Sequence, residues 1–396
     1  MSTNLNGGKV NNFDLEDDME EESTSSKGKN KEDLKKFIIK LMLVVGGSVL
    51  LLILVLSLSS MVTKKKYTYE QVEQIMADAA KAFIAENSEY STILESRIIE
   101  VPVENLVAAG KMKPLAEYKN ENCTGKVTVS KVNNEYIYTP TLNCGTNYSS
   151  TALYTKVLED SPITTTGYGL YSINGEKVFR GELVNNYVKL EKALWRIVKI
   201  DQSNNIVLIK ETQTGYTSAW DNRYNEDIGY NVGINTYAIS RIKEYLQSIY
   251  NTTKETEIFL STKDKAKLIS YDACVGSRAT NSKTNTNEIE CKTKESSQKI
   301  GLLTVSDYIN ASTDPKCVTA ESLSCQNYNY LIKNFNWWLA TPVTNTTDRA
   351  YSITTKGEIK SSQTGDYYNV RPVIKLNSTV TISGGTGTEK DPYTVK

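Results

Sequence analysis

The sequence contains no histidine, the side chain that enzymes most often use as a general base and that proteins most often use to bind zinc. It also has no excess of charge of either sign, because 46 lysines and arginines balance 46 aspartates and glutamates. Lysines and carboxylates are interspersed along most of the chain, so no basic face for nucleic acid stands out. We therefore expect no nucleic-acid partner, no metal, no cofactor and no enzymatic activity.

Motifs of common reactions are missing as well. There is no G-x-S-x-G elbow, and a Cys-His protease set cannot form without histidine. The glycines at 384, 385 and 387 are followed by no helix and by no lysine at phosphate-loop spacing, so we interpret them as turn glycines. A redox role for Cys317 and Cys325 is a weaker hypothesis than a structural disulfide.

A long apolar run over residues 37–62 is the strongest signal in the sequence, and Lys40 is its only charge. As a helix rising about 1.5 Å per residue, this run exceeds the roughly 30 Å thickness of a membrane core. We predict an uncleaved single-pass transmembrane helix. A cleaved signal peptide is the alternative, since Ser57 and Ser59 are small, but the run is long for a signal and a tail precedes it.

The preceding tail, residues 1–36, is acidic and poor in large apolar residues, so we expect it to be disordered. It is either a solvated spacer or, less simply, an acidic docking peptide. Lysines flank both ends of the apolar run and leave the orientation open. The cysteines indicate the orientation of the chain in the membrane, because all six follow the apolar run and lie in close successive pairs.

Three local disulfides in an oxidising compartment explain the cysteine pattern, with free buried thiols as the alternative. The predicted pairs are Cys123 with Cys144, Cys274 with Cys291, and Cys317 with Cys325. We therefore predict a cell-membrane protein anchored in the lipid bilayer by residues 37–62, with a cytoplasmic N-terminus and extracellular domains.

A small juxtamembrane domain is predicted over residues 67–160. Apolar residues recur at helical spacing from Tyr69 to Glu86, and this amphipathic helix needs a partner, either strands of the same chain or a second copy of the chain. Residues 126–132 and 135–142 alternate polar and apolar around Asn133-Asn134, which predicts a hairpin flanked by Cys123 and Cys144. A Ser/Thr/Gly-rich passage, residues 161–169, then separates this domain from the next.

The second domain, residues 167–396, shows short strand runs with separate helices. Residues 194–200 and 205–210 are predicted as a hairpin, residues 237–250 as a helix and residues 277–297 as a long polar loop. Further strands are predicted at the C-terminal end, over residues 349–354, 370–376 and 379–382. The fold class is therefore α+β with short antiparallel strands and long loops.

Five phrases occur in fixed order in this domain: NNYVKLEKALWRIVKI, KIGLLTVSDYINAS, NWWLATP, YNVRPVIKLNSTV and GGTGTEKDPYTV. This order resembles an uncharacterised, DUF6273-like family of membrane-anchored bacterial surface proteins with a WWL-x-[ST]-P segment before a V-R-P strand. The resemblance implies a C-type-lectin-like fold related to formylglycine-generating enzymes. The resemblance does not imply the activity of these enzymes, because no cysteines of this chain match their reactive cysteine pair.

Several residues of these five sequence phrases are expected to have structural roles. Trp195 supplies buried apolar area. Arg371, held before Pro372, is expected to hydrogen-bond carbonyls or a carboxylate of a neighbouring loop. Adjacent Trp337 and Trp338 must point to opposite faces of a strand, so one is expected in the core and the other on an exposed face as a stacking platform. The alternative is that a second layer covers both.

Asp221, Asn222 and Asp227 in the segment AWDNRYNEDIG are the other candidate binding residues, and a calcium site there is a weak possibility. We predict a non-enzymatic surface protein whose outer domain binds an unknown carbohydrate or protein. The alternative is a structural or sensory membrane protein that acts through assembly of the helix at 69–86 and through the acidic tail.

Overall fold

The structure is a computed structural model that describes residues 34–42, 45–46, 67–94, 98–119, 121–132, 135–145, 147–253, 259–283 and 288–396. Residues 1–66 and 67–396 form two separate units. Of the predicted tail, only residues 34–36 are described, and they are helical. Of the predicted membrane segment, residues 37–42 and 45–46 are described and helical, while the remainder lies outside the described residues. None of the described helices is long and apolar enough to cross a membrane.

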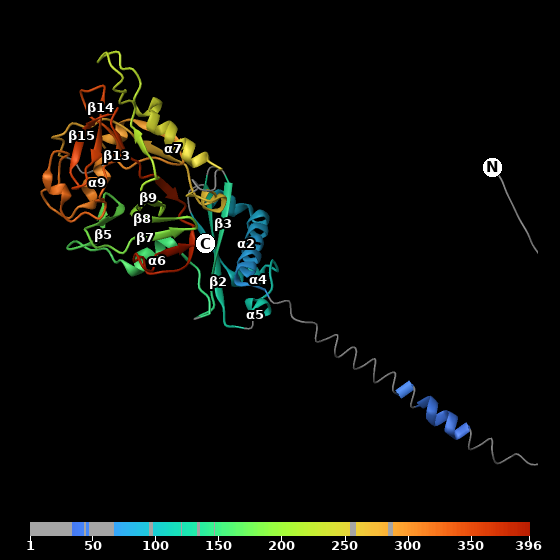
Figure 1. Cartoon of the computed structure of the whole chain (residues 1–396). Coiled ribbons are helices and arrows are strands. Elements are labelled where there is room, and N and C mark those ends of the chain that lie inside the picture. The colour runs from blue at the N-terminus through green and yellow to red at the C-terminus, as the bar shows by residue number, and fades with distance from the viewer. Residues whose placement is uncertain are drawn as a thin grey trace, which may run out of the picture. The chain divides into compact units, whose positions relative to one another are not determined.

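The unit from Tyr67 to Lys396 begins with a module of one long helix on a three-stranded antiparallel sheet of order β1-β2-β3 (Figure 1). Its elements are α2 (Tyr69–Glu86), α3 (Ser88–Leu94), β1 (Ile99–Pro102), α4 (Val103–Ala108), α5 (Leu115–Tyr118), β2 (Thr124–Val132) and β3 (Glu135–Asn143). The predicted helix and hairpin are confirmed, and the turn at 133–134 lies outside the described residues.

Local chemistry explains the start of α2. Thr68 accepts a hydrogen bond from the backbone of Gln71, whose side chain in turn accepts one from the backbone of Thr68, so the two form a capping box. The apolar face of the helix, with Val72 and Met76 fully buried, packs on the sheet of its own chain. The partner of this helix is therefore intramolecular, as the simpler of the two alternatives predicts.

A nine-stranded sheet forms the middle of the unit, with β17-β9-β8-β7-β19-β18-β4 in order, β6 beside β8 and β5 beside β6. All pairs are antiparallel except β19 with β7. The strands are β4 (Thr151–Ala152), β5 (Gly169–Ile173), β6 (Glu176–Arg180), β7 (Tyr187–Leu190), β8 (Ala193–Ile200), β9 (Ile206–Lys210), β17 (Val373–Leu376), β18 (Thr381–Gly384) and β19 (Tyr393–Val395).

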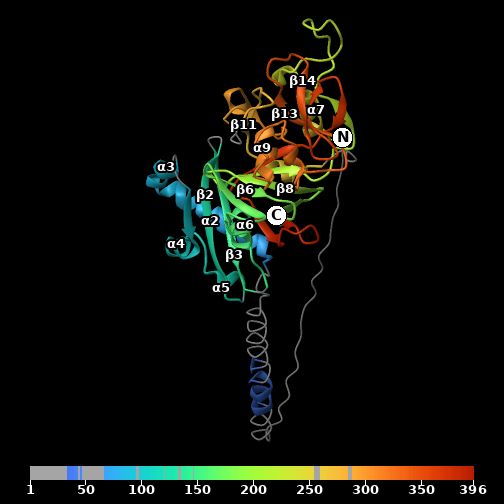
Figure 2. The same cartoon turned by 90° about the vertical axis from the view of Figure 1, so that its left-hand side faces the viewer.

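A second, five-stranded sheet of order β10-β16-β13-β14-β15 lies at the end of the unit away from α2 (Figures 1 and 2). Its strands are β10 (Thr217–Ala219), β13 (Trp337–Pro342), β14 (Arg349–Ile353), β15 (Ile359–Gln363) and β16 (Tyr367–Asn369). The remaining elements are β11 (Tyr271–Cys274), β12 (Lys294–Gln298), α6 (Leu153–Asp160), α7 (Arg241–Asn251), α8 (Thr262–Ala266), α9 (Val305–Ala311) and three 3₁₀ turns, η1 (Tyr237–Ile239), η2 (Glu290–Lys292) and η3 (Leu323–Gln326).

Two predicted segments differ from the structure. The polar stretch 277–297 is not a loop throughout, because η2 lies within it and β12 begins in it and pairs with β11. The predicted helix at 237–250 is divided at Ser240, whose side chain accepts a hydrogen bond from the backbone of Lys243 and so caps α7. The α+β class with short, mainly antiparallel strands is confirmed.

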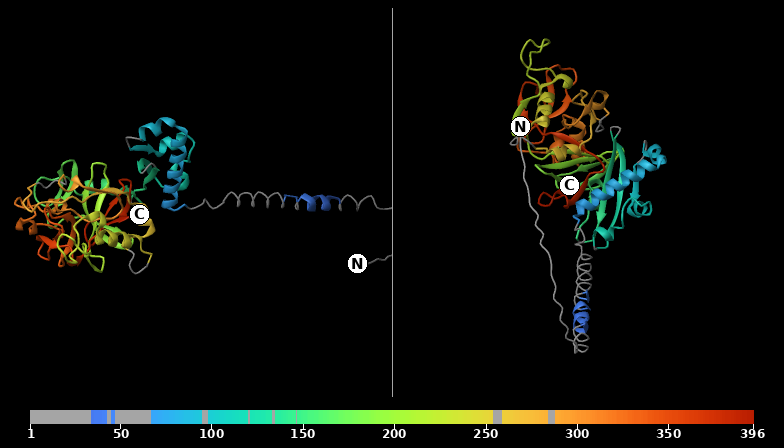
Figure 3. Two further views of the ribbon diagram at one scale, coloured as in Figure 1. Left: turned by 90° about the horizontal axis from the view of Figure 1, so that it is seen from above. Right: turned by 90° about the vertical axis from the view of Figure 1, so that its right-hand side faces the viewer.

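The apolar cores divide between Cys144 and Leu153. Thus β4 pairs with β18, and α6 packs in the core of the larger domain, although the sequence boundary at 160 assigns both to the juxtamembrane domain. The C-terminus lies beside α2 (Figures 1 and 3), where Lys396 contacts Glu73 and Tyr148. All three predicted disulfides are present, and the described residues include no free cysteine.

Candidate functional site

The predicted loop site does not assemble into a cation site. Asp221 is fully buried, and its carboxylate pairs with the guanidinium of Arg223 and accepts a hydrogen bond from the backbone of Arg241 at the start of α7. Asn222 donates to the hydroxyl of Tyr367 over 3.0 Å, and Asp227 is exposed. Asp221 therefore holds its own loop and the start of α7, and its charge is already matched by an arginine.

Among the described residues, one group has the composition of a metal site: Glu121, Cys123 and Cys144. Its two sulfur atoms are bonded to each other in a disulfide. A disulfide sulfur is not a thiolate, the form in which cysteine binds metals, so this group is not a metal centre.

The expectation that one of two adjacent tryptophans is exposed is wrong. Trp337 and Trp338 are both 0% exposed, because β13 lies inside the five-stranded sheet and both of its faces are covered. The indole of Trp338 donates to the carbonyl of Ser218 over 2.8 Å. The ring of Trp337 packs edge-on against Tyr308, with the guanidinium of Arg371 4.8 Å from its centre. Neither ring is a stacking platform for a ligand.

Arg371 makes the contacts expected for a buried guanidinium before a rigid proline. It donates to the carbonyls of Lys210 and Leu331, each over 3.0 Å, and the carbonyl of Pro372 accepts a hydrogen bond from the backbone of Lys210. Trp195 is likewise fully buried in the larger core. One nitrogen of Arg371, Nη2, makes no hydrogen bond within the described part of the chain.

A cavity of about 670 Å³ lies beside β8, β11 and the start of α9. Five of its charged groups are paired with one another: Lys199 lies 3.0 Å from Glu176 and 3.2 Å from Asp307, and Lys375 lies 2.6 Å from Asp201. Two exposed carboxylates, Asp272 and Glu288, also line the cavity. Burial alone lowers the pKa of Lys199, but the two carboxylates raise it overall, so the lysine stays charged and paired. The two paired lysines are therefore bound within the fold and are not free to hold an anionic ligand.

A second cavity, of about 540 Å³, has a different character, and we call it the arginine pocket. It lies between the segment that leads into β7 and the segment that follows η3. It is lined by Glu182, Tyr187, Arg196, Gln326, Asn327, Tyr328, Asn329, Tyr330, Ile332 and Lys333. Most of these side chains are aromatic, amide or cationic, which is a combination suited to a polar ligand.

The guanidinium of Arg196 is held in one orientation at the wall of the arginine pocket. It lies 3.8 Å from the ring centre of Tyr187 and 4.8 Å from that of Tyr330, so two aromatic faces enclose it. Its Nε donates to the side chain of Asn186, and its Nη2 donates to the carbonyl of Val184. Two of its nitrogens thus carry fixed hydrogen bonds.

Glu211, which follows β9, is the carboxylate behind this wall. Its oxygens lie 3.9 Å from Nη1 of Arg196 and 3.7 Å from Nη2 of Arg371, and it pairs with the ammonium of Lys333. Lys210 is its neighbour in the chain and donates to Thr212 over 2.6 Å. One carboxylate is therefore shared among several cations.

Burial, and after it repulsion between the cations, lowers the pKa values of this cluster. Burial, followed by repulsion from Arg371, lowers the pKa of Lys210 to about 8. Burial also lowers the pKa of Arg371 to about 10, against the opposing attraction of Glu211. The pKa of Lys333 is lowered by the same two causes that act on Lys210. The attraction of Glu211 opposes this lowering in all three groups but is smaller than the effect of burial.

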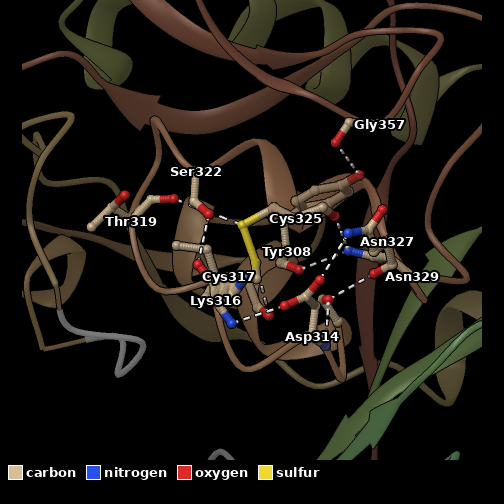
Figure 4. Close-up of a disulfide and its surroundings, with 12 residues drawn as sticks. Tyr308, Asp314, Lys316, Cys317, Thr319, Ser322, Cys325, Asn327, Asn329 and Gly357 are labelled. Carbon is tan, nitrogen blue, oxygen red and sulfur yellow. Dashed lines mark hydrogen bonds between the residues drawn. A yellow bond between two sulfur atoms is a disulfide. The ribbon is translucent and has the colours of Figure 1, made fainter.

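The outer wall of the arginine pocket is fastened by the disulfide between Cys317 and Cys325 (Figure 4). Asn327, two residues after the disulfide, donates to the carboxylate of Asp314 over 2.8 Å, and Asn329 donates to the carbonyl of Tyr308 over 3.1 Å (Figure 4). A short loop without regular structure thereby acquires a fixed shape.

The two walls are joined at Gly181, whose carbonyl accepts a hydrogen bond from the backbone of Tyr330 over 2.9 Å. Gly181 has a φ of +112°, and a Cβ there would lie 2.4 Å from the ring of Tyr168, so only glycine fits. That ring in turn packs against Tyr328, which is 51% exposed at the rim. The rim therefore presents an aromatic face to solvent.

The sequence alone does not identify the residues of the arginine pocket. A signal for Arg196 is present, since it is a charged residue in the middle of the apolar strand LWRIVKI, where an arginine must find partners. Lys333 and the asparagines are ordinary surface residues in the sequence. Nothing in their spacing shows that the chain brings them to Arg196.

Residues 203–378 match the model of a family described as "Domain of unknown function (DUF6273)". The matched segment contains the wall at 326–333, Glu211 and Arg371, whereas Tyr187 and Arg196 precede it. No curated protein and no solved structure shows significant similarity to the chain.

Proposed function

We propose that this chain is a non-enzymatic cell-surface binding protein and that its larger domain binds a carbohydrate or a protein at the arginine pocket. The observation that carries the proposal is the guanidinium of Arg196, fixed between two tyrosines at the wall of a cavity of about 540 Å³. A donor held rigidly before the ligand arrives loses little conformational entropy on binding. Such preorganisation is typical of recognition sites.

The rest of the lining supports binding of a polar molecule. Tyr328 offers an exposed ring on which a sugar or a peptide group can stack, and Gln326 offers an amide with no hydrogen-bond partner among the described residues. The wall that carries both is fastened by a disulfide.

The proposed location rests on two features of the sequence and one of the structure. The apolar run at 37–62 is long enough to anchor the chain in a bilayer. All six cysteines follow it, and they form three disulfides, which persist in oxidising compartments. We therefore place the N-terminus in the cytoplasm and the unit from Tyr67 onward outside the cell.

The location is tested by adding protease to intact cells that express the chain with an epitope at Ser2. We expect digestion of the region after Lys64 and protection of the epitope until the cells are lysed. Loss of the epitope before lysis would overturn the proposed orientation.

We also propose that residues 167–396 form a C-type-lectin-like domain of a bacterial surface protein. The support is the order of the five phrases in the sequence and the α+β arrangement of short, mainly antiparallel strands. An experimental structure of the full chain, superposed on C-type-lectin-like domains, tests this relation.

The alternative function, assembly through the helix at 69–86, has less support. The apolar face of α2 is buried against the sheet of its own chain, so assembly would need another face of the helix. Concentration-dependent association of the full chain in detergent, abolished by substitutions on the exposed face of α2, would favour this alternative.

Binding is tested by probing glycan and protein arrays with the full chain in detergent. We expect retention of a defined set of ligands and loss of retention in Tyr328→Ala, which removes the ring at the rim. Tyr216→Ala is the matched control, because Tyr216 is 64% exposed and lies outside the arginine pocket. If no ligand is retained, or if both variants behave alike, the arginine pocket is not the binding site.

A further inference from the structure

We infer that the arginine pocket selects a ligand of about the size of a sugar that carries a carboxylate or phosphate group. This inference deepens the proposed function and rests on it. A cavity of about 540 Å³ falls within the roughly 300–1,000 Å³ usual for small-molecule sites, so its volume suits one or two sugar rings.

The first argument is the balance of charge. Four cations, the side chains of Arg196, Lys210, Lys333 and Arg371, gather around the single carboxylate of Glu211. Two exposed carboxylates lie nearby: Glu182 in the lining and Glu389 close to Tyr187. Cations remain in excess when both are counted. Moreover, exposed carboxylates are hydrated and can turn away, whereas the cations are largely buried.

The second argument is the set of donors that the fold leaves unused. Nη2 of Arg371, a residue behind the lining of the cavity, lies 3.7 Å from Glu211 and makes no hydrogen bond to any described residue, so it does not satisfy that carboxylate. Nη1 of Arg196, a residue that lines the cavity, has Glu211 as its ion-pair partner at 3.9 Å, beyond hydrogen-bonding distance. A guanidinium has five N–H donors in a planar fork, which matches the paired oxygens of a carboxylate or a phosphate. An anion at the wall would supply the acceptor that Nη1 lacks.

An anionic ligand would also offset the cost of burying the ammonium of Lys333 beside Arg371. Lys333 pairs with Glu211 yet still has a lowered pKa, because burial and Arg371 act against its charge. A second anion beside Lys333 and Arg196 would stabilise both cations at once. Binding energy from this relief is available to a charged ligand and not to a neutral one.

The inference is tested by isothermal titration calorimetry of the full chain with glucuronate, glucose 6-phosphate, inorganic phosphate and glucose, at equal ionic strength. We expect binding of the two anionic sugars, weaker binding of phosphate alone and no binding of glucose. Added sodium chloride should weaken the binding of the anionic sugars, because salt screens the attraction between partly exposed charges. Comparison of the four probes separates a carboxylate, a sugar phosphate and a free phosphate as the preferred source of the charge.

Three variants localise the binding. Lys333→Gln should weaken binding of the anionic sugars by about tenfold or more, and Lys333→Arg should retain it, since one charge-assisted hydrogen bond contributes roughly this factor. Lys360→Gln removes a charge from an exposed position of β15 and should change nothing. Thermal melting of each variant verifies that it is folded.

Two outcomes separate this inference from the proposed function. If arrays show ligand binding that depends on Tyr328 but glucose binds as well as glucuronate, or Lys333→Gln binds normally, the anionic specificity is wrong and the binding function stands. If neither the arrays nor the anionic sugars show binding, both are wrong.

Discussion

Lys210 is a buried lysine beside Glu211, and its pKa is lower than that of an ordinary lysine. Its ammonium is buried, and burial together with Arg371 lowers its pKa to about 8 from an ordinary value near 10.5. The folded protein therefore holds this proton less tightly than the unfolded chain does. Between about pH 8 and pH 10.5 the unfolded chain binds more protons, so the contribution of Lys210 to stability rises with pH across that window.

We predict that the stability of the wild type, relative to Lys210→Met, increases from about pH 8 to pH 10.5. Each unit of pKa shift corresponds to about 1.4 kcal/mol, so the relative gain is at most about 3.5 kcal/mol. Urea unfolding of both proteins at several pH values measures it. The comparison with the variant cancels the destabilisation that buried tyrosines such as Tyr351, whose pKa burial raises to about 12, cause above pH 10. A pH-independent difference would refute the shifted pKa.

The two adjacent tryptophans are both fully buried in the core of the larger domain. We predict that Trp337→Ala and Trp338→Ala each lower the free energy of unfolding by roughly 3–5 kcal/mol, the range for truncating a large buried aromatic. Chemical denaturation of both variants measures the loss. Tyr230→Ala is the control, because that ring is 70% exposed and its removal should change stability little. A Trp variant as stable as the control would contradict the buried positions.

Among the structural elements, the loop between α9 and β13 depends most on covalent and side-chain support. It has one 3₁₀ turn of four residues, η3, and the wall of the arginine pocket follows this turn directly. The disulfide between Cys317 and Cys325 and the side-chain hydrogen bonds of Asn327 and Asn329 replace the backbone ladder that a strand would supply (Figure 4). The shape of the pocket is therefore tied to one crosslink.

We predict that the double substitution Cys317→Ser and Cys325→Ser weakens ligand binding at the arginine pocket by more than tenfold. Its cost in stability should be about 2.5 kcal/mol, the chain-entropy value for so short a loop. Calorimetry and thermal melting measure the two effects. Replacing Cys123 and Cys144 with serine is the control, since that larger loop should cost more stability while leaving affinity unchanged. Equal affinity in the two double variants would show that the crosslink does not shape the pocket.

For the whole unit, a polar contact joins the module of α2 and the three-stranded sheet to the larger domain. The ammonium of Lys396 lies 3.4 Å from the carboxylate of Glu73 on α2 and contacts Tyr148. Glu73 also accepts a hydrogen bond from Tyr148 over 2.9 Å and one from Ser150. The carboxylate is largely buried, so the lysine that pairs with it fastens the two apolar cores together.

We predict that Lys396→Met lowers the free energy of unfolding by about 1–3 kcal/mol, because it leaves the buried carboxylate of Glu73 without its cation. Lys390→Met, at an exposed position in the same C-terminal segment, is the control. Urea unfolding followed by fluorescence measures both. A separate early transition in Lys396→Met alone would show that the contact couples the two modules, whereas identical curves would rule out the coupling.

Periodicity and turn chemistry in the sequence are enough to predict α2 and the hairpin of β2 and β3, because their signals are local: a helical apolar stripe, and alternation around two asparagines. The three disulfides follow from the close spacing of successive cysteines. The boundary between the cores was misplaced, since α6 carries too few residues to show which core buries it.

The arginine pocket depends instead on contacts between residues far apart in the chain. Arg196 on β8 and Lys333 line one cavity because the loop after η3 returns to the paired strands β7 and β8, and Glu211 joins them from the end of β9. Likewise, the alternation of Trp337 and Trp338 is local, but their common burial requires layers on both faces of β13. The sequence alone therefore determines the local helices and hairpins, because neighbouring residues specify them. Burial and charge pairing between residues far apart in the chain are decided only by the tertiary structure, because they form when the elements pack together.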